Sequence, residues 1–269
     1  MRSKTIKAQG KKYTKKLNNN LIWIYGRHAC EAALENNTRI VQKIYLLKNK
    51  KNSDNFIKSF STRKSIIEKV SYVDNKFFHT KVGKDVKHQG VLISAKRINI
   101  FDYSQLFNNK MKDEKLKLGI ILDNITDPNN VGAIYRSARA FNVSFIINAE
   151  TKSISESSSL LNVACGAFET INSYSCKNIN DCIKKFKENG WWVVGMDTDA
   201  KEEFNSFLND INKNEKFIFI LGSEGKGIRR LVKKNCDYLY KISTENNQYS
   251  LNVSNAAAIV FYGFFNALN

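Results

Sequence analysis

Short, unbroken apolar runs in the second half of the chain limit its possible folds more strongly than any other feature. The runs do not alternate with polar residues, so both faces of each strand are expected to be buried. Segments of helix-forming composition separate them. This pattern predicts an α/β fold with a mostly parallel sheet. The expected strands are residues 118–122, 144–148, 191–196 and 217–221, and the expected helices are residues 130–141, 155–163, 179–188, 227–234 and 251–268.

The first half of the chain shows a second, smaller alternation of strand and helix patterns. It predicts a small α/β domain over residues 21–97, followed by a linker over 98–116 and a second domain over 117–269. Residues 1–20 are basic and almost without apolar side chains, so we expect a disordered tail. The expected strands of the small domain are residues 21–25, 43–47, 69–73 and 88–95, and its expected helices are residues 28–34 and 52–68.

Positive charge is concentrated at the beginning of the chain. The 269 residues carry a net charge of +18. Residues 1–97 contain 23 Lys and Arg against six Asp and Glu, whereas residues 98–269 contain 20 against 19. Such asymmetry favours a polyanion-binding region joined to a nearly neutral one, and nucleic acid is the expected partner. A general solubility charge or a Lys- and Asn-rich composition would also produce the excess.

Several protein classes are disfavoured by the composition. No apolar stretch approaches the roughly 18 residues that span a bilayer, and no secretory signal follows the basic tail, so a cytoplasmic protein is expected. The cysteines are odd in number, scattered and free of any C-x-x-C pair, which favours reduced thiols over a disulfide framework or a metal site. They are Cys30, Cys165, Cys176, Cys182 and Cys236.

Candidate functional residues occur in three segments, each of which is expected to follow a strand, where open α/β sheets bind ligands. Residues 123–139 form a loop and helix start that contain Arg136, whose forked guanidinium suits a phosphate. Residues 221–227 contain three glycines, which let the backbone approach a ligand closely. Residues 249–258 begin a helix with Ser and Asn, which are common N-caps. Each segment alone also fits an ordinary capped helix or surface loop.

Taken together, the three segments resemble a known family. In order and spacing they are similar to the three motifs of the SpoU/TrmH family, which contains S-adenosylmethionine-dependent RNA ribose 2′-O-methyltransferases of the SPOUT class. The matching stretches are Asn130-x-Gly132-x-x-x-Arg136-Ser137-Ala138, Gly222-Ser223-Glu224-Gly225 and Ser250-Leu251-Asn252-Val253-Ser254. The resemblance implies a trefoil-knotted α/β domain, S-adenosylmethionine as cofactor, and a homodimer formed through the knotted domain.

The resemblance also assigns roles to individual residues. Arg136 would be the central catalytic residue. Because its pKa lies above about 12, we expect it to bind a phosphate and orient the 2′-hydroxyl rather than act as a base. The other catalytic residues would be Asn130, Glu224, Ser250 and Asn252, and the cofactor-binding residues would be Gly222, Ile242 and Leu251. Residues 242–249 lack the proline and glycine usual in the family, so a looser cofactor loop is expected.

The small domain resembles the substrate-binding domain of one branch of this family. Residues 25–34 and 88–91 look like the L30e-like domain of the enzymes that methylate a guanosine of bacterial 23S ribosomal RNA. The resemblance implies RNA binding by Arg27 and His28, together with Arg136. A tRNA substrate and a non-catalytic RNA-binding or ribosome-assembly protein of the same fold remain alternatives. A dinucleotide-dependent enzyme is disfavoured, because the glycine spacing at 222–227 is not that of a Rossmann loop.

Overall fold

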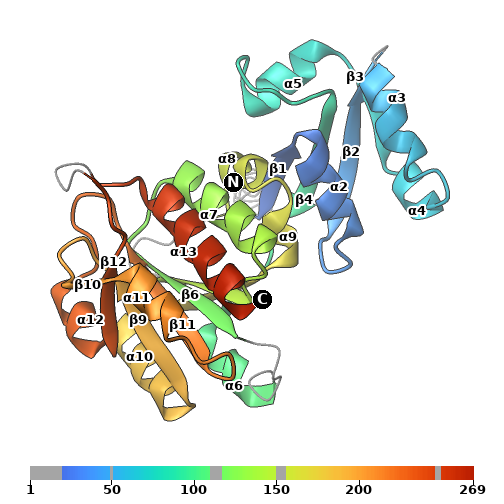
Figure 1. The fold of residues 1–269 in the computed structure, drawn as a ribbon. Helices are drawn as coiled ribbons and strands as arrows, with labels where there is room; N and C mark the ends of the chain where they lie inside the picture. Colours follow the sequence, from blue (N-terminus) through green and yellow to red (C-terminus); the bar gives the residue numbers. More distant parts are fainter. Residues whose placement is uncertain (1–19, 49–50, 110–116, 150–155, 246–249) are drawn as a thin grey trace, which may run out of the picture. The chain divides into compact units, whose positions relative to one another are not determined.

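The protein was analysed as a computed structural model, which describes residues 20–48, 51–109, 117–149, 156–245 and 250–269 (Figure 1). These residues form two compact units. Unit 1 contains the described residues up to Asn99 together with Glu156–Glu169, and unit 2 contains those of Ile100–Ser155 and Thr170–Asn269. Most of the predicted tail, residues 110–116 of the predicted linker, Ser155 and residues 246–249 of the predicted cofactor loop lie outside the described residues.

Unit 1 is built on a four-stranded sheet with the strand order β1-β4-β2-β3. Strand β4 pairs antiparallel with both neighbours, whereas β2 and β3 are parallel. The elements are β1 (Leu21–Tyr25), α2 (Arg27–Glu35), β2 (Val41–Leu47), α3 (Lys51–Lys58), α4 (Lys64–Ile67), β3 (Val70–Val73), α5 (Asn75–Val82), β4 (Val91–Lys96), α8 (Ser158–Val163) and α9 (Ala167–Thr170), whose last residue belongs to unit 2.

Unit 2 is built on an eight-stranded sheet with the order β10-β12-β9-β11-β6-β7-β8-β5. All of its described neighbouring strands run parallel, which confirms the predicted mostly parallel α/β fold. The elements are β5 (Phe101–Asp102), η1 (Tyr103–Gln105), α6 (Leu106–Asn109), β6 (Leu118–Asp123), α7 (Pro128–Ala140), β7 (Phe145–Ala149), β8 (Asn172–Cys176), α10 (Ile179–Glu188), β9 (Trp191–Met196), β10 (Glu202–Glu203), α11 (Phe204–Asn209), β11 (Lys216–Gly222), α12 (Arg230–Asn235), β12 (Tyr238–Lys241) and α13 (Val253–Leu268).

Helices cover both faces of the sheet of unit 2 (Figure 1). On one face α10 packs against β9 and α12. Its Phe186 meets Phe145 and Trp191 with ring centroids 5.4–5.7 Å apart. Gly119 makes room for this cluster, since a Cβ there would lie 2.3 Å from the Phe145 ring. On the other face α13 packs against α7 and α11, and its Phe264 contacts aromatic rings of β11.

Several predicted element bounds differ from the structure for identifiable local reasons. The predicted helix 52–68 is divided into α3 and α4, where the Ser59 hydroxyl donates to the Phe56 carbonyl and three-residue turns replace regular helical bonds. The helix predicted from residue 227 begins only at Arg230, because Gly227 has a φ of +59°. The last helix begins at Val253, with Asn252 as its N-cap rather than a member.

Residues 100–109, which the sequence suggests belong to a linker, are integrated into unit 2. Strand β5 pairs with β8 at the edge of the sheet. Leu106 is buried in the same core cluster as Phe145 and Phe186. The apolar side chains of this short region therefore attach it to the sheet.

A buried ion-pair cluster joins residues 156–169 to the small domain within unit 1. The Arg39 side chain is fully buried, and its guanidinium contacts the carboxylates of Glu156, with an N–O distance of 2.6 Å, and of Glu169. Arg39 also donates to the Lys96 carbonyl at 2.8 Å. Burial raises the pKa of Glu156 even though Arg39 opposes this effect. The cluster thus depends on each partner to compensate a desolvated charge.

We predict that Arg39→Met destabilises unit 1 by about 3–5 kcal/mol, because it leaves two buried carboxylates without their cation. Urea unfolding followed by hydrogen exchange of unit 1 amides would measure the change. Arg63→Met is the matched control, since Arg63 is exposed and makes one long hydrogen bond to the Leu34 carbonyl. Equal stability of the Arg39 variant and the wild type would contradict the role of the cluster.

Candidate active site

The carboxyl ends of four adjacent strands of unit 2 meet at one edge of its sheet. Strands β12, β9, β11 and β6 are neighbours in that order. Their register aligns Met196 with Leu221, and Gly222 with Asp123. The chain leaves each strand in a polar segment, so four polar segments converge where parallel sheets usually bind ligands.

Three polar side chains predicted as catalytic form a hydrogen-bonded triangle at this edge. Asn130 Nδ2 donates to Glu224 Oε1 at 2.9 Å. Asn252 Nδ2 donates to Asn130 Oδ1 at 3.0 Å and to the same Glu224 oxygen at 2.6 Å. The structure therefore brings together residues that lie as far as 122 positions apart in the sequence, one from each of the three motifs.

Helix capping fixes two corners of this triangle. Asn130 lies in the first turn of α7, where Asp127 is the N-cap and accepts from the Asn129 amide at 3.0 Å. Asn252 is itself the N-cap of α13, and its Oδ1 accepts from the Ser254 amide at 2.8 Å. Because the cap uses the amide oxygen, the amide nitrogen of Asn252 points to the triangle. Local helix geometry thus sets the direction of each side chain.

The glycine segment after β11 forms a close backbone turn. Ser223 and Gly227 form an isolated bridge, with the Gly227 amide donating to the Ser223 carbonyl at 2.8 Å. A Cβ on Gly222 would lie 2.1 Å from the Gly227 carbonyl carbon. Only glycine fits at this position, since any side chain would displace the turn that carries Glu224.

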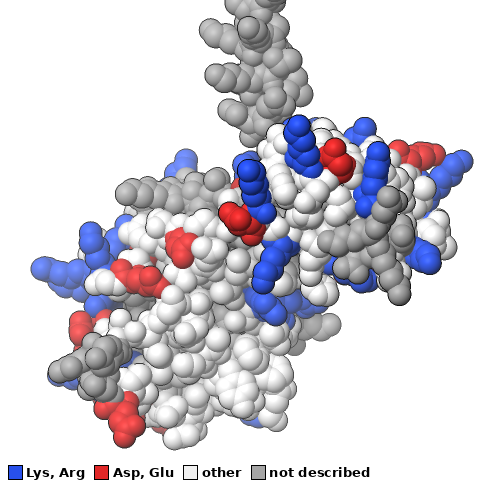
Figure 2. All heavy atoms as spheres, turned by 90° about the horizontal axis from the view of Figure 1, so that it is seen from above, with Lys and Arg blue, Asp and Glu red and all other residues white. Residues whose placement is uncertain are grey.

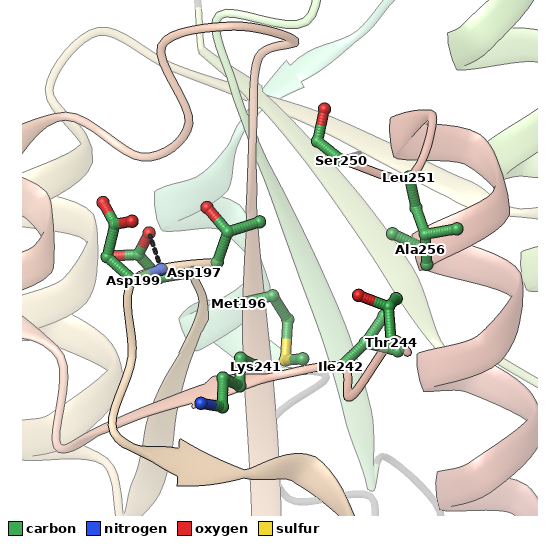
Figure 3. Close-up of a pocket in the computed structure, with 10 residues that line it drawn as sticks. Met196, Asp197, Asp199, Lys241, Ile242, Thr244, Ser250, Leu251 and Ala256 are labelled. Carbon is green, nitrogen blue, oxygen red and sulfur yellow. Dashed lines mark hydrogen bonds between the residues drawn. The ribbon is translucent and has the colours of Figure 1, made fainter. Parts of the chain in front are cut away.

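A cavity of about 340 Å³ opens at the ends of β9 and β12 (Figure 3). Its lining includes Ile242, Ser250 and Leu251, three of the predicted site residues. Figure 3 shows Asp197 and Asp199 on one side, and Leu251 and Ala256 on the other. A second hollow of about 170 Å³ shares Met196, Ser250 and Leu251 with it and is also lined by Gly222 and Glu224. The predicted cofactor-binding residues therefore line two hollows that share several residues.

Arg136 occupies a different position from the other predicted catalytic residues. It lies in the second half of α7, and its side chain is exposed. It takes no part in the triangle, and it is not among the residues that line the cavity. An exposed guanidinium outside the cavity is free to contact a bound polyanion.

The sequence reasoning missed the acidic segment after β9. Asp197, Thr198 and Asp199 all line the cavity. Asp197 pairs with Lys233 at 2.5 Å, and its Oδ1 accepts from the Asp199 amide at 3.4 Å. The same rule that selected the other loops would have found this one, because it directly follows a predicted strand.

A second ion pair supports the first loop. Asp123 is fully buried at the end of β6, and its carboxylate accepts from both the backbone amide and the Nε of Arg229, at 3.0 and 2.8 Å. Because Arg229 directly precedes α12, this pair attaches the glycine segment to β6. The two central loops of the site are thereby held together.

The residues predicted to bind RNA in the small domain lie at a separate pocket in unit 1. Arg27 and His28 line a hollow of about 180 Å³ together with Lys87 and Gln89. The Arg27 amide donates to Gln89 Oε1 at 2.7 Å, which joins the two N-terminal motifs. His88 of the second motif is buried and stacks on Phe78 with a centroid distance of 4.3 Å, so its role is structural.

Three of the described cysteines are poorly suited to act as thiolate nucleophiles or metal ligands. Burial raises the pKa of the Cys30 and Cys182 thiols well above the usual value and that of Cys236 to about 12, so these groups stay protonated at neutral pH. No cluster of three or more His, Cys, Asp or Glu suited to a metal ion occurs among the described residues. Within the same residues, no helix has the length and apolar character needed to cross a bilayer.

Comparison with known proteins gives a consistent family assignment. The profile of the SpoU rRNA methylase family matches residues 117–262, and that of the RNA 2′-O ribose methyltransferase substrate-binding domain matches residues 23–100. The 23S rRNA (guanosine-2′-O-)-methyltransferase RlmB of Coxiella burnetii is 32% identical over 240 residues, covering 89% of this chain and 93% of the relative. RlmB of Neisseria meningitidis is 30% identical, covering 88% and 92%.

Solved structures agree with this assignment at the level of fold. The SpoU methyltransferase AviRb of Streptomyces viridochromogenes superposes with a TM-score of 0.74 at 16% identity, covering 95% of this chain and 92% of its own. The AdoMet-bound rRNA methyltransferase of Sinorhizobium meliloti superposes with a TM-score of 0.71 at 18% identity, covering 96% and 91%. The chain belongs to the SpoU rRNA methylase family.

Proposed function

We propose that the protein is an S-adenosylmethionine-dependent RNA 2′-O-methyltransferase that modifies a guanosine ribose of 23S ribosomal RNA. The observation that carries the proposal is the Asn130–Glu224–Asn252 triangle beside the cavity, which unites all three family motifs in one site. Relatives whose names specify this reaction cover about nine-tenths of the chain. The family membership supports the reaction class, and these relatives support the nucleotide.

The cavity fits S-adenosylmethionine in both size and chemistry. Its lining combines apolar side chains such as Leu251, which suit an adenine ring, with the carboxylate of Asp199, which suits a cation (Figure 3). Ile242 and Leu251 would hold the cofactor, together with Gly222, which lines the smaller hollow. When bound, the cofactor supplies an electrophilic methyl group for transfer to oxygen.

The polar residues of the site would orient the RNA rather than take part in covalent chemistry. Arg136 would bind the phosphate next to the target ribose through its two-pronged guanidinium and position the 2′-hydroxyl. The triangle and Ser250 would hold the loops so that the hydroxyl lies in line with the methyl group, because alignment of the two reactants dominates such a transfer. Glu224, already hydrogen-bonded to two amides, keeps its loop closed toward the cavity.

Unit 1 would bind the RNA substrate. We propose that residues 21–97 form an L30e-like substrate-binding domain and that residues 117–269 form the trefoil-knotted catalytic domain. Arg27 and His28 would contact phosphates at the pocket of unit 1. Figure 2 shows exposed Lys and Arg side chains on the described residues, with Asp and Glu among them. This charge favours fast, salt-dependent association.

We also propose a homodimer formed through the second domain. Helix α13 leaves Ile259, Tyr262 and Phe265 exposed by 39–54%, which is unusual for three large apolar side chains on one helix. A second copy of the same helix would cover them.

Because the proposed substrate is ribosomal RNA, we also propose that the protein acts in the cytoplasm.

The direct test is methyl transfer from labelled S-adenosylmethionine to a 23S rRNA transcript, with a tRNA transcript as the competing substrate. We expect incorporation into the 23S transcript, mapped to a guanosine 2′-oxygen. Incorporation into tRNA alone would identify a tRNA enzyme. No incorporation into either RNA at saturating cofactor would identify a non-catalytic RNA-binding protein.

We predict that Arg136→Lys lowers methyl transfer by about 10- to 100-fold, since an ammonium lacks the fork that aligns phosphate and hydroxyl. S-adenosylmethionine affinity, measured by calorimetry, should stay unchanged because Arg136 does not line the cavity. Arg139→Lys is the matched control, as Arg139 is exposed one turn further along α7. Near-full activity of Arg136→Lys would show that the forked contact is unnecessary.

We predict that Asn252→Asp lowers methyl transfer by about 100-fold with little loss of stability. Aspartate keeps the oxygen that caps α13, but it loses the donor to Asn130 and places a carboxylate against Glu224. Turnover and thermal midpoint should be measured together. Asn252→Ser, which also caps a helix, separates the lost hydrogen bonds from the added charge. Wild-type turnover in both variants would show that the triangle is not needed.

A further inference from the structure

The sheet of unit 1 has one face that is only partly covered. Its buried half lies under α5, whose Phe78 packs on Tyr25 and Leu92. The other half presents Trp23 on β1 and Tyr45 on β2, and Phe77 of α5 packs beside them. We call Trp23, Tyr45 and Phe77 the aromatic face. All three side chains are partly exposed, in contrast to the fully buried Phe78.

The strand register explains why these rings meet. Trp23 and Lys43 both lie opposite Ser94 of the central strand β4, and Tyr45 lies opposite Leu92. Partners in register share a face, so Trp23, Lys43 and Tyr45 project from the same side of the sheet. The ring centroids are 5.8 Å apart for Trp23 and Tyr45, and 4.6 Å apart for Tyr45 and Phe77. The result is a continuous aromatic surface contributed by three elements.

Lysine side chains border this surface. Lys81 Nζ lies 5.3 Å from the Trp23 ring centroid and 5.6 Å from that of Phe77. Lys43 Nζ lies 6.0 Å from the Tyr45 centroid. Strands β1 to β4 and helix α5 contain no Asp or Glu at all, although they contain four lysines. The acidic residues of the small domain are confined to its other helices and its turns.

This combination matches a ligand that has flat aromatic groups and negative charges in alternation. Partly exposed rings beside cations are how proteins bind single-stranded nucleic acid: bases stack on the rings while lysines contact the phosphates. One carboxylate lies next to the aromatic face, since Asp74 caps α5 and its Oδ1 accepts from the Phe77 backbone amide at 2.9 Å. A protein partner would be favoured by a mixture of charges or by a larger apolar area, and neither occurs on these elements. Double-stranded RNA offers no free base to stack.

We propose that the aromatic face is a stacking platform for unpaired bases of the RNA substrate, flanked by Lys43 and Lys81 as phosphate contacts. The inference rests on the proposed function, which makes RNA the substrate, and adds that unit 1 recognises a single-stranded segment of it. The platform is distinct from the pocket at Arg27 and His28, since the two share no lining residue. Unit 1 would thus have a site for bases and a site for phosphates.

The test compares the full-length wild type with the double variant Tyr45→Leu/Phe77→Leu, which keeps apolar bulk but removes two rings. Affinity is measured at the same series of salt concentrations for a ten-nucleotide single-stranded RNA and for the same sequence as a duplex. We expect the double variant to bind the single strand about 5- to 100-fold more weakly, with duplex binding nearly unchanged. Unchanged S-adenosylmethionine affinity and thermal midpoint would show that the variant is folded.

Tyr72→Leu is the matched control. Tyr72 is 50% exposed on β3 of the same sheet, and its register partner Leu46 points away from Tyr45. Its variant should bind both probes like the wild type. The ring-keeping pair Tyr45→Phe/Phe77→Tyr should restore single-strand binding. Lys81→Gln should lower the salt slope by about one without changing the preference for single strands.

Two results would overturn the platform: unchanged single-strand affinity of the double variant, or equal losses for single strand and duplex. Neither result bears on methyl transfer, which is measured separately on the wild type. A wild type that methylates 23S rRNA while the double variant binds normally would reject the platform alone. A wild type that transfers no methyl group, yet shows the single-strand loss in the variant, would reject the proposed function alone.

Discussion

The parallel register of β9, β11 and β6 is the constraint on which the site depends. Leu221 of the middle strand is in register with both Met196 and Leu122. The residues that follow them in the three strands are therefore next to one another at the same edge of the sheet. Those residues are Asp197, Gly222 and Asp123. A slip of one residue in either pairing would move one loop away from the others and reverse the faces of its strand. Buried strands such as these hold their register firmly, because both faces are packed.

Close backbone contact then converts aligned strand ends into a defined site. Gly222 lets the chain fold back so that Ser223 and Gly227 pair, which places Glu224 within hydrogen-bonding distance of Asn130 and Asn252. The two asparagines are held by helix starts rather than by flexible loops. Preorganised side chains of this kind lose little conformational entropy when they position a substrate.

The sequence predicted the features that depend on local chemistry and missed those that depend on long-range packing. Unbroken apolar runs predicted the strands β6, β9 and β11. Strand β8 was not predicted, because Asn172, Ser173 and Ser175 are polar residues typical of a loop. Family resemblance identified the three corners of the triangle. It did not identify Asp197 and Asp199, which no motif covers, and nothing local indicated that Arg136 would lie apart from the cavity.

The boundary between the two units does not follow the order of the sequence. Charge and pattern place the small domain within residues 21–97, yet Glu156–Glu169 packs with it in unit 1. Leu160 and Leu161 are buried, Asn162 donates to the Tyr25 carbonyl at 3.2 Å, and Glu156 and Glu169 compensate the buried charge of Arg39. Removing residues 1–97 would therefore expose apolar side chains and two carboxylates of the remaining chain. The small domain is not a simple appendage, because part of the core of unit 1 is encoded between β7 and β8 of the other sheet.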